Sequence, residues 1–308
     1  MNAELIRVAP AEWPGLAGLI VEHNRRASGG VHCLHARQGD DLSSHAAELA
    51  GLAADAAAFW VLKEGGALLA IVGCEIDLAL QRAWLRGPLW ADPRAAEMLL
   101  RTVGPTLQAA LPAVSQFDAF PTLDGEPLNA WLGLAGYEAL QVHTLLRAPI
   151  GAPASPEVAG ARRATASDLA SALALHQTLF PSAYITEAEF VRGLGEADCA
   201  LFVASLHDDT PSAYLFVQDA PIDHEVYIDY LGVDPQQRRA GLDRALLGAA
   251  ARWGTDRGRD HVALTVREDR RSAHALYRQS GFAEVSSGRH WRKTVATPAL
   301  QTDPRDRG

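Results

Sequence analysis

Apolar positions along the chain fall into two series that follow the same order. Each series starts with a short strand and an amphipathic helix, continues with two apolar strands around a polar turn, and ends with a helix, a Gly–aromatic pair and a strand. The matching segments are 5–23 and 161–180, 58–76 and 199–218, and 131–147 and 276–293. This pattern predicts an internal repeat with an offset of about 140–156 residues.

The order of elements within each series predicts the fold class. Strand, helix, antiparallel strands, helix, strand, helix and strand is neither regular βα alternation nor an all-β pattern. It predicts an α/β (mixed α+β) fold in which helices cover both faces of a mixed, mostly antiparallel sheet. The predicted organisation is a domain at 1–150, a Pro-, Gly- and Ala-rich linker at 151–160, a domain at 161–294 and a mobile tail at 295–308.

Bulk properties agree with two globular domains. The 308 residues suffice for two cores, and 48% apolar with 21% charged residues is typical of globular proteins. The three cysteines (Cys33, Cys74 and Cys199) are odd in number and widely spaced, which predicts no disulfide framework and a reducing compartment. We find no signal-peptide pattern and no run of 18 apolar residues, so we expect a cytoplasmic protein with no membrane partner, as a monomer or homodimer.

The charge is negative overall and uneven. A formal net charge of −9 argues against a nucleic-acid partner. Residues 1–157 carry 10 basic and 17 acidic residues, whereas residues 158–308 carry 18 and 20. The arginines of the second half concentrate in 238–278, where they favour an anionic ligand.

One stretch of the second half predicts an anion site. Residues 226–233 have the pattern of a buried strand, followed by an arginine-rich turn and an amphipathic helix that ends near Gly258. The apolar positions of that helix are Leu242, Ala245, Leu246, Ala249, Ala250 and Trp253. A short loop between a strand and a helix presents free backbone N–H groups at the positive end of the helix dipole. Arg238, Arg239 and Arg244 add positive charge beside it.

The turn resembles the pyrophosphate-binding motif of the GNAT superfamily of N-acetyltransferases, R/Q-x-x-G-x-G/A, with the usual V-x-P before it (Val233-Asp234-Pro235). The resemblance implies two tandem GNAT-like domains, acetyl-CoA as cosubstrate, and no metal. It implies that the loop amides hold the CoA pyrophosphate and that the preceding strand splays to admit the pantetheine arm. The implied cofactor-binding residues are Leu231, Val233, Arg238, Arg239, Ala240, Gly241, Leu242, Asp243, Arg244, Arg270 and Ala273.

Asp243 departs from the motif, which has Gly or Ala at this position. A carboxylate that faced a diphosphate in a partly screened site would cost about 1–2 kcal/mol. Alternatively, Asp243 points outward and favours the N-terminus of the helix, and this is the orientation we expect.

A second motif follows at the expected spacing. Residues 261–266 have the pattern of a strand, and 267–282 that of a loop, a helix and a glycine stop. The segment is similar to the family's N-x-x-A-x-x-L-Y-x-x-x-G-F pattern, with Arg270 in place of Asn. The match implies that Tyr277 protonates the departing CoA thiolate, because a phenol of pKa about 10 is a suitable acid for it. The alternative role of Tyr277 is that of a half-buried aromatic residue that closes the helix on the sheet.

Carboxylates on the strand before the loop are candidates for the general base. Glu225, Tyr227 and Asp229 alternate along the strand and are predicted to share a face with Leu231 and Val233. In the family, carboxylates on this strand often deprotonate the amine, so Asp229 is the first candidate and Glu225 the second. Alternatively, both carboxylates lie in water near the strand end.

The first half lacks these chemical features. Residues 89–100, where the phosphate loop is expected, contain no glycine, and Leu132 stands four residues before Gly136, where the tyrosine is expected. The first half is therefore interpreted as a degenerate copy, in a layout similar to that of mycothiol synthases.

Two histidine-containing segments are candidates for further sites. His32, Cys33 and His35 invite a metal interpretation, but the sequence has no second cluster at a known spacing, so no metal is predicted. His274 either lines the site of Tyr277 or lies exposed on its helix.

The sequence thus predicts transfer of an acetyl group from acetyl-CoA to a small-molecule amine by direct attack in a ternary complex. The alternative is an acyl-CoA-binding or scaffold protein with decayed catalysis, which Asp243 and Arg270 favour.

Overall fold

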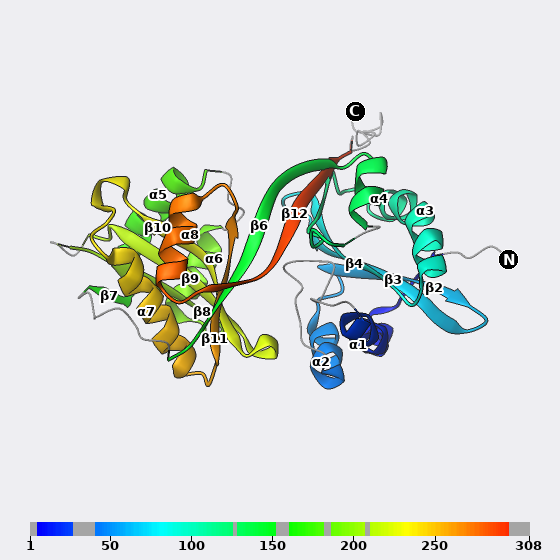
Figure 1. Ribbon diagram of the computed structural model, residues 1–308, viewed down its shortest axis with the longest axis horizontal. Helices are drawn as coiled ribbons and strands as arrows, with labels where there is room; N and C mark the ends of the chain where they lie inside the picture. The colour runs from blue at the N-terminus through cyan, green and yellow to red at the C-terminus, as the bar shows by residue number, and fades with distance from the viewer. Residues whose placement is uncertain are drawn as a thin grey trace, which may run out of the picture. The chain divides into compact units, whose positions relative to one another are not determined.

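The chain folds into two units that each contain a helix-covered sheet (Figure 1). Unit 1 comprises Met1–Val142 and Ser286–Gly308, and unit 2 comprises His143–Val285. The computed structural model describes residues 5–26, 41–125, 128–151, 160–181, 186–206 and 210–295. The predicted α/β fold with two tandem domains and mostly antiparallel sheets is confirmed.

In unit 1, the strands follow the order β1-β2-β3-β4-β5-β12. The strands are β1 (Leu5–Arg7), β2 (Ala57–Glu64), β3 (Ala67–Asp77), β4 (Arg82–Trp90), β5 (Gln116–Ala119) and β12 (Ala283–Thr294). The helices are the 3₁₀ helix η1 (Pro10–Leu16), α1 (Ala17–Arg26), α2 (Leu42–Gly51), α3 (Pro93–Ala110) and α4 (Leu128–Leu134). β4 and β5 run parallel, and β1 to β4 pair antiparallel in succession.

Unit 2 has the strand order β6-β11-β10-β9-β8-β7. The strands are β6 (Glu138–Pro149), β7 (Ala161–Arg163), β8 (Cys199–Ala204), β9 (Ala213–Ala220), β10 (Glu225–Val233) and β11 (His261–Arg267). The helices are α5 (Leu169–Leu179), α6 (Glu187–Gly195), α7 (Leu242–Thr255) and α8 (Arg271–Gln279), with 3₁₀ turns η2 (Ala166–Asp168), η3 (Pro221–Asp223) and η4 (Pro235–Gln237). β10 and β11 run parallel, as β4 and β5 do in unit 1.

The last strand of each half completes the sheet of the other unit. His143–Pro149 of β6 pairs antiparallel with β11, and Trp291–Thr294 of β12 pairs antiparallel with β5. The units therefore differ in their boundaries from the predicted domains at 1–150 and 161–294. The alternation of apolar and polar residues predicts a strand but not the strand with which it pairs. The reason is that the free backbone groups of a sheet edge can form hydrogen bonds with many different strands. The predicted linker 151–160 and tail 295–308 lie outside the described residues except for Gly151, Gly160 and Val295.

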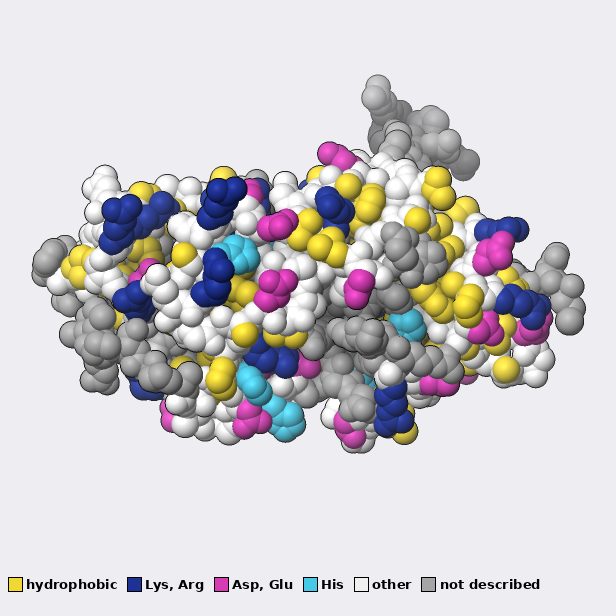
Figure 2. All heavy atoms as spheres, in the orientation of Figure 1, with side chains coloured by type: hydrophobic (Ala, Val, Ile, Leu, Met, Phe, Trp, Pro, Cys, Tyr) yellow, Lys and Arg dark blue, Asp and Glu magenta, His cyan; other side chains and the backbone are white. Residues whose placement is uncertain are grey.

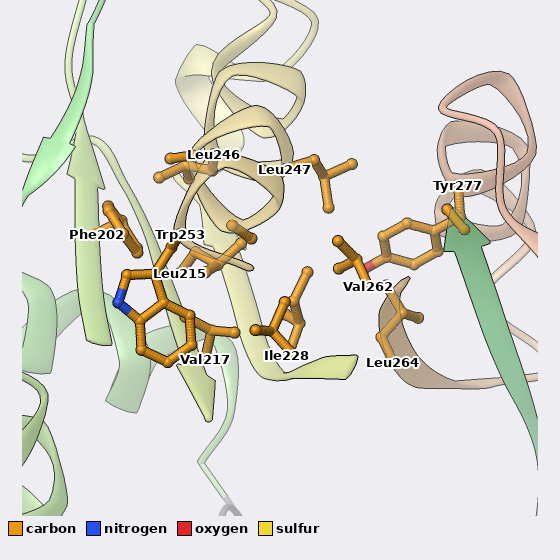
Figure 3. Close-up of a cluster of buried hydrophobic side chains, with 14 of the residues drawn as sticks. Phe202, Leu215, Val217, Ile228, Leu246, Leu247, Trp253, Val262, Leu264 and Tyr277 are labelled. Atoms are coloured by element: carbon orange, nitrogen blue, oxygen red, sulfur yellow. The ribbon is translucent and has the colours of Figure 1, made fainter. Parts of the chain in front are cut away.

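The sheet of unit 2 has an apolar core on each face. The α7/α8 cluster lies under those two helices and contains Leu215, Val217, Ile228, Leu246, Leu247, Trp253, Val262, Leu264 and Tyr277 (Figure 3). The α5/α6 cluster lies on the opposite face and contains Phe190, Leu201, Val203, Tyr214 and Phe216. All six apolar positions predicted for the α7 helix are buried, as an amphipathic helix on a sheet requires.

The two cysteines in described strands are buried free thiols, Cys74 in β3 and Cys199 in β8. Burial raises the pKa of the Cys199 thiol to about 11, and the charge of Asp198 adds to the rise, so this thiol remains protonated at neutral pH. Cys33 lies outside the described residues. Within the described ranges, no helix combines the length and the apolar character needed to cross a bilayer.

A buried carboxylate anchors β12 in unit 1. Asp118 of β5 has no exposed surface and accepts hydrogen bonds from Arg82 (2.5 Å), Arg292 (2.9 Å) and Gln116 (2.7 Å), and it contacts His290 Nε2 at 2.5 Å. Burial alone would raise the pKa of Asp118, but the hydrogen bonds from His290, Arg82 and Arg292 outweigh it and hold the pKa well below its usual value. A single ionised group thus ties β4, β5 and β12 together.

We predict that Asp118→Asn destabilises unit 1, because the change leaves the partly buried arginines of β4 and β12 without their counter-charge. Breaking a buried ion pair on one side costs about 3–5 kcal/mol. Urea unfolding followed by tryptophan fluorescence measures the loss. The exposed Asp55 supplies the matched control, and Asp55→Asn is expected to change stability by less than about 0.5 kcal/mol. Equal stability of the two variants would contradict the anchoring role.

Candidate functional site

The parallel pairing of β10 with β11 ends part of the way along both strands. Residues are in register from Glu225 with His261 to Ile228 with Leu264. β10 continues to Val233 and β11 to Arg267, each still paired to its other neighbour. Beyond Leu264, the backbone groups that face between the two strands have no ladder partner in the described part of the chain. Such groups are suited to an extended ligand that hydrogen-bonds like a strand.

A β-bulge lies where the two strands part. Ile228 pairs with Val217 and Tyr230 with Phe216, so Asp229 has no counterpart on β9. The extra residue changes which side chains share a face. Tyr230 packs on the α5/α6 cluster, whereas Leu231 and Val233 pack on the α7/α8 cluster. The predicted common face of Asp229 with Leu231 and Val233 is therefore wrong, since simple alternation does not account for a bulge.

Asp229 lies in an environment that disfavours its charge. Its Oδ2 atom is shielded from solvent and has no hydrogen-bond partner among the described residues. Burial raises the pKa of Asp229 to about 7, a hydrogen bond from the Gln218 side chain opposes the rise, and the charge of Glu189 on α6 adds to it. A carboxylate with a pKa near the working pH is suited to take a proton and release it again.

Glu225 is held in an ion pair. Its side chain is buried, and Arg147 Nη2 lies 2.6 Å from its Oε2 atom. Between Glu225 and Asp229, the hydroxyl of Tyr227 donates to Thr265 Oγ1 at 2.7 Å. Glu225 therefore does not lie in water at a strand end, which was one of the two roles left open by the sequence.

The loop after β10 has the backbone geometry of an anion site. The Asp234 side chain accepts a hydrogen bond from Gln236 N at 2.8 Å and fixes the first turn. Arg239 (φ 66°) and Gly241 (φ 84°) then adopt left-handed conformations and turn the chain into α7. Gly241 is the N-cap of α7 and has no side-chain oxygen to occupy the first amides. These amides therefore lie at the positive end of the helix without a side-chain cap from Gly241.

The arginines of this loop are available to an anion. Arg238, Arg239 and Arg244 are exposed, and no carboxylate of the described residues forms an ion pair with any of them. Arg244 Nη2 donates to Gln279 Oε1 at 2.9 Å and so links α7 to α8. Figure 2 shows basic side chains over the part of unit 2 where Figure 1 draws α8.

Asp243 contacts the helix backbone. Its Oδ1 atom accepts a hydrogen bond from Arg244 N at 2.8 Å, which is the arrangement expected of a carboxylate that favours a helix N-terminus. Leu242 and Ala240, on the same turn, pack on the α7/α8 cluster.

Tyr277 points from α8 into the sheet. Its ring contacts Phe282 at 5.6 Å between centroids, and Figure 3 shows its hydroxyl end beside Val262 of β11. The side chain is buried, and burial raises the pKa of Tyr277 to about 12, with a further rise from the charge of Asp243. The phenol therefore stays protonated at neutral pH. The residue closes α8 on the sheet, and its hydroxyl lies beside Val262, which is two residues before the last paired residue of β11, Leu264.

The start of α8 is polar and exposed. Arg270 precedes the helix with its side chain exposed, 4.0 Å from Asp269, and Ala273 packs on the α7/α8 cluster. His274 is half-buried, and its Nε2 atom lies 3.1 Å from the backbone oxygen of Arg267. His274 is thus not freely exposed but bonded to the preceding loop.

The corresponding positions of unit 1 have different contacts. Asp92 caps α3 and accepts a hydrogen bond from Ala95 N at 2.8 Å, so a carboxylate already occupies the helix amides. Leu132 is fully buried in the core of unit 1. Within the described residues, no group of three His, Cys, Asp or Glu is arranged to hold a metal, and His32, Cys33 and His35 lie outside those residues.

Several residues of this site were not found from the sequence. Arg147, Gln218, Glu189 and Thr265 come from four different elements, and their positions relative to β10 follow from sheet register and helix packing. No local pattern marks them in the sequence.

Residues 169–282 match the sequence family described as Acetyltransferase (GNAT) family. This segment runs from the start of α5 past the end of α8, so it includes β10, the arginine loop and Tyr277. This part of the chain is therefore similar to the GNAT acetyltransferase family, and the predicted resemblance is confirmed.

Relatives of known activity align with parts of the chain. Aminoglycoside N(6')-acetyltransferase type 1 from Stenotrophomonas maltophilia is 29% identical over 134 residues, which are 40% of this chain and 86% of that protein. Mycothiol acetyltransferases from Clavibacter sepedonicus and Salinispora arenicola (strain CNS-205) are 41% and 47% identical over 69 and 64 residues. These two matches cover 22% and 20% of this chain and the same shares of the mycothiol acetyltransferases.

Solved structures align with almost the whole chain. A GCN5-related N-acetyltransferase from Sphaerobacter thermophilus has a TM-score of 0.72 at 18% identity and covers 95% of this chain and 96% of its own. A tandem GNAT protein from the clavulanic acid biosynthesis pathway has a TM-score of 0.63 at 15% identity, with 96% and 99% covered. At these identities the likeness establishes the fold alone, and that fold is the tandem GNAT arrangement.

Proposed function

We propose that the protein transfers an acetyl group from acetyl-CoA to the amine of a small molecule, by direct attack in a ternary complex. The observation that carries the proposal is that β10 and β11 separate after Ile228 and Leu264, with three chemical groups on β10 and on the helices that pack beside it. These groups are the arginine-flanked start of α7, where Gly241 provides no side-chain cap, the carboxylate of Asp229 and the phenol of Tyr277. The names of the aminoglycoside and mycothiol relatives support a small molecule as the acceptor.

Acetyl-CoA would bind with its pyrophosphate on the loop from Arg238 to Arg244, which fits an anion because its arginines have no carboxylate partners. The pantetheine arm would enter between β10 and β11, where the ladder between them has ended. A backbone N–H of β10 near Val233 would polarise the thioester carbonyl. No metal is needed for this arrangement.

The chemistry then needs two proton transfers. Ionised Asp229 takes one proton from the acceptor amine, and the amine nitrogen forms a bond to the thioester carbonyl carbon. The carbon–sulfur bond breaks, and Tyr277 gives its proton to the leaving thiolate. The phenolate regains a proton from solvent and Asp229 returns its own, so both residues end in their starting states. Glu225, the second candidate for the base, is already paired with Arg147.

An acyl-CoA-binding or scaffold protein is the second candidate function. Asp243 favours it, because its carboxylate occupies a helix amide beside the proposed pyrophosphate site. Binding of acetyl-CoA without transfer to any amine of a broad panel would support this alternative over catalysis.

We predict that each chain binds one acetyl-CoA in calorimetry, on the arginine loop of unit 2. Arg238→Ala is expected to weaken binding about tenfold through loss of a charge-assisted contact. Arg94 lies at the start of α3, the helix of unit 1 that follows the parallel strand β4, and Arg94→Ala is expected to leave affinity unchanged. Two equivalent sites per chain would contradict the assignment of unit 1, and no binding at millimolar ligand would exclude the acyltransferase function.

Tyr277→Phe is predicted to lower turnover by about 10- to 100-fold, the contribution of one general acid. The affinity for acetyl-CoA is expected to stay nearly constant, since the ring and its packing are retained. Steady-state kinetics and calorimetry on the same variant separate the two effects. Unchanged turnover would show that Tyr277 acts only in packing and that water protonates the thiolate.

The raised pKa of Asp229 predicts how activity depends on pH. The base must be ionised, so kcat/KM is expected to fall as pH drops below about 7 and the carboxylate takes up a proton. Asp229→Asn is expected to reduce kcat/KM by about 100-fold or more. Glu187 is an exposed carboxylate on α6, and Glu187→Gln serves as the control. This variant is expected to keep the wild-type rate and the wild-type fall of kcat/KM at acid pH. An acid limb near pH 4, or full activity of Asp229→Asn, would contradict this role.

A further inference from the structure

A cation from the first half of the sequence reaches the proposed reaction face of unit 2. Arg147 lies on β6, in the strand that pairs with β11, and its Cα partner there is Ala263. Its neighbours Leu146 and Ala148 pack in the α7/α8 cluster. Because side chains alternate along a strand, Arg147 lies on the opposite face of the sheet, the face that also carries Glu225 and Tyr227.

The contact between Arg147 and Glu225 spans three strands. β6 and β10 are separated by β11, so their backbones are about 9–10 Å apart. Arg147 Nη2 nevertheless lies 2.6 Å from Glu225 Oε2. Ala263 of β11 lies beside Arg147 and Tyr227 in one row, and Glu225 lies two residues before Tyr227 on β10. The small side chain of Ala263 leaves room for the long arginine side chain to cross β11 toward Glu225.

The ion pair is not required to hold β6 in the sheet. β6 and β11 are in register from His143–Arg267 to Pro149–His261, and this backbone pairing suffices to dock a strand. The effect of Arg147 is instead electrostatic. Without it, Glu225 would be a buried carboxylate with the charge of Asp229 four residues away, about 13 Å along the same strand.

The polar and titratable groups near the two carboxylates come from several elements. Those that face Asp229 are Gln218 of β9, Glu189 of α6 and Tyr227 of β10. Those that face Glu225 are Arg147 of β6, Tyr227 of β10 and, by register, His261 of β11. Among these described groups, Arg147 is the permanent positive charge.

We propose that Arg147 is a positioning residue: it fixes Glu225 and balances its charge, so that Asp229 is the carboxylate of β10 left to take the proton of the acceptor amine. The inference rests on the proposed acetyl transfer. It also gives β6 a functional role, because this strand of the first half supplies Arg147 to the site in the second half.

Four variants of the full chain test the charge balance. Arg147→Met leaves the negative charge of Glu225 without its counter-charge. The pH below which kcat/KM falls (the acid limb) is expected to rise by about half to one pH unit. Glu225→Gln leaves Arg147 unbalanced and is expected to move the limb down by a similar amount. The double variant is expected to return the limb to the wild-type position, and Arg147→Lys to keep it there because the charge is retained.

Carboxyl titration by NMR, with ¹³C-labelled Asp and Glu, measures the same shifts without any activity. Opposite shifts of the Asp229 titration in the two single variants support the proposal even if no acetyl transfer is detected, in which case only the proposed function fails. Thermal unfolding of each variant shows whether it is folded. If Arg147→Met does not fold, Glu225→Gln and the double variant still give the comparison. Variants that lose stability but keep the wild-type limb and titration would overturn the proposal and leave Arg147 a purely structural role.

Discussion

Two parallel strands that stay paired for four residues and then separate are the constraint on which the proposed site depends. The last pair is Ile228 with Leu264, and the bulge at Asp229 follows immediately. The bulge places the Asp229 carboxylate in a buried environment that raises its pKa. Beyond the bulge, β10 continues into the loop that precedes α7. Because strand backbones and helix ends must satisfy their hydrogen bonds, the same interruption that ends the ladder leaves groups for a ligand.

The same scaffold carries different chemistry in the two units. In unit 1, Asp92 caps the helix that follows the parallel strand, and Leu132 fills the core. In unit 2, the N-cap Gly241 has no side chain, Asp243 within the helix accepts from Arg244 N, and Tyr277 brings a hydroxyl to the sheet. Each unit keeps its own apolar core, so the fold is retained although the residues at these corresponding positions differ.

The exchange of terminal strands makes the units interdependent. β12 runs from the end of α8 into unit 1, where the ionised Asp118 anchors it, and β6 brings Arg147 to Glu225 in unit 2. Both contacts bring a buried carboxylate next to an arginine. Removing either partner would leave the other charge unpaired in the protein, which is costly in free energy. Neither half of the sequence alone contains all the residues of the unit that it mainly builds.

The sequence by itself determined the fold class, the tandem layout, the helix of α7 and the arginine loop before it, because these follow from local periodicity and from residues adjacent in the chain. Asp229 was also identified, but alternation placed it on the face of Leu231 and Val233, and only the structure revealed the bulge. The unit boundaries and Arg147 were decided by tertiary structure. The physical reason is that strand pairing joins residues that lie far apart in the sequence. The edge of a sheet can pair with many different strands, so a local sequence pattern does not predict which strand it binds.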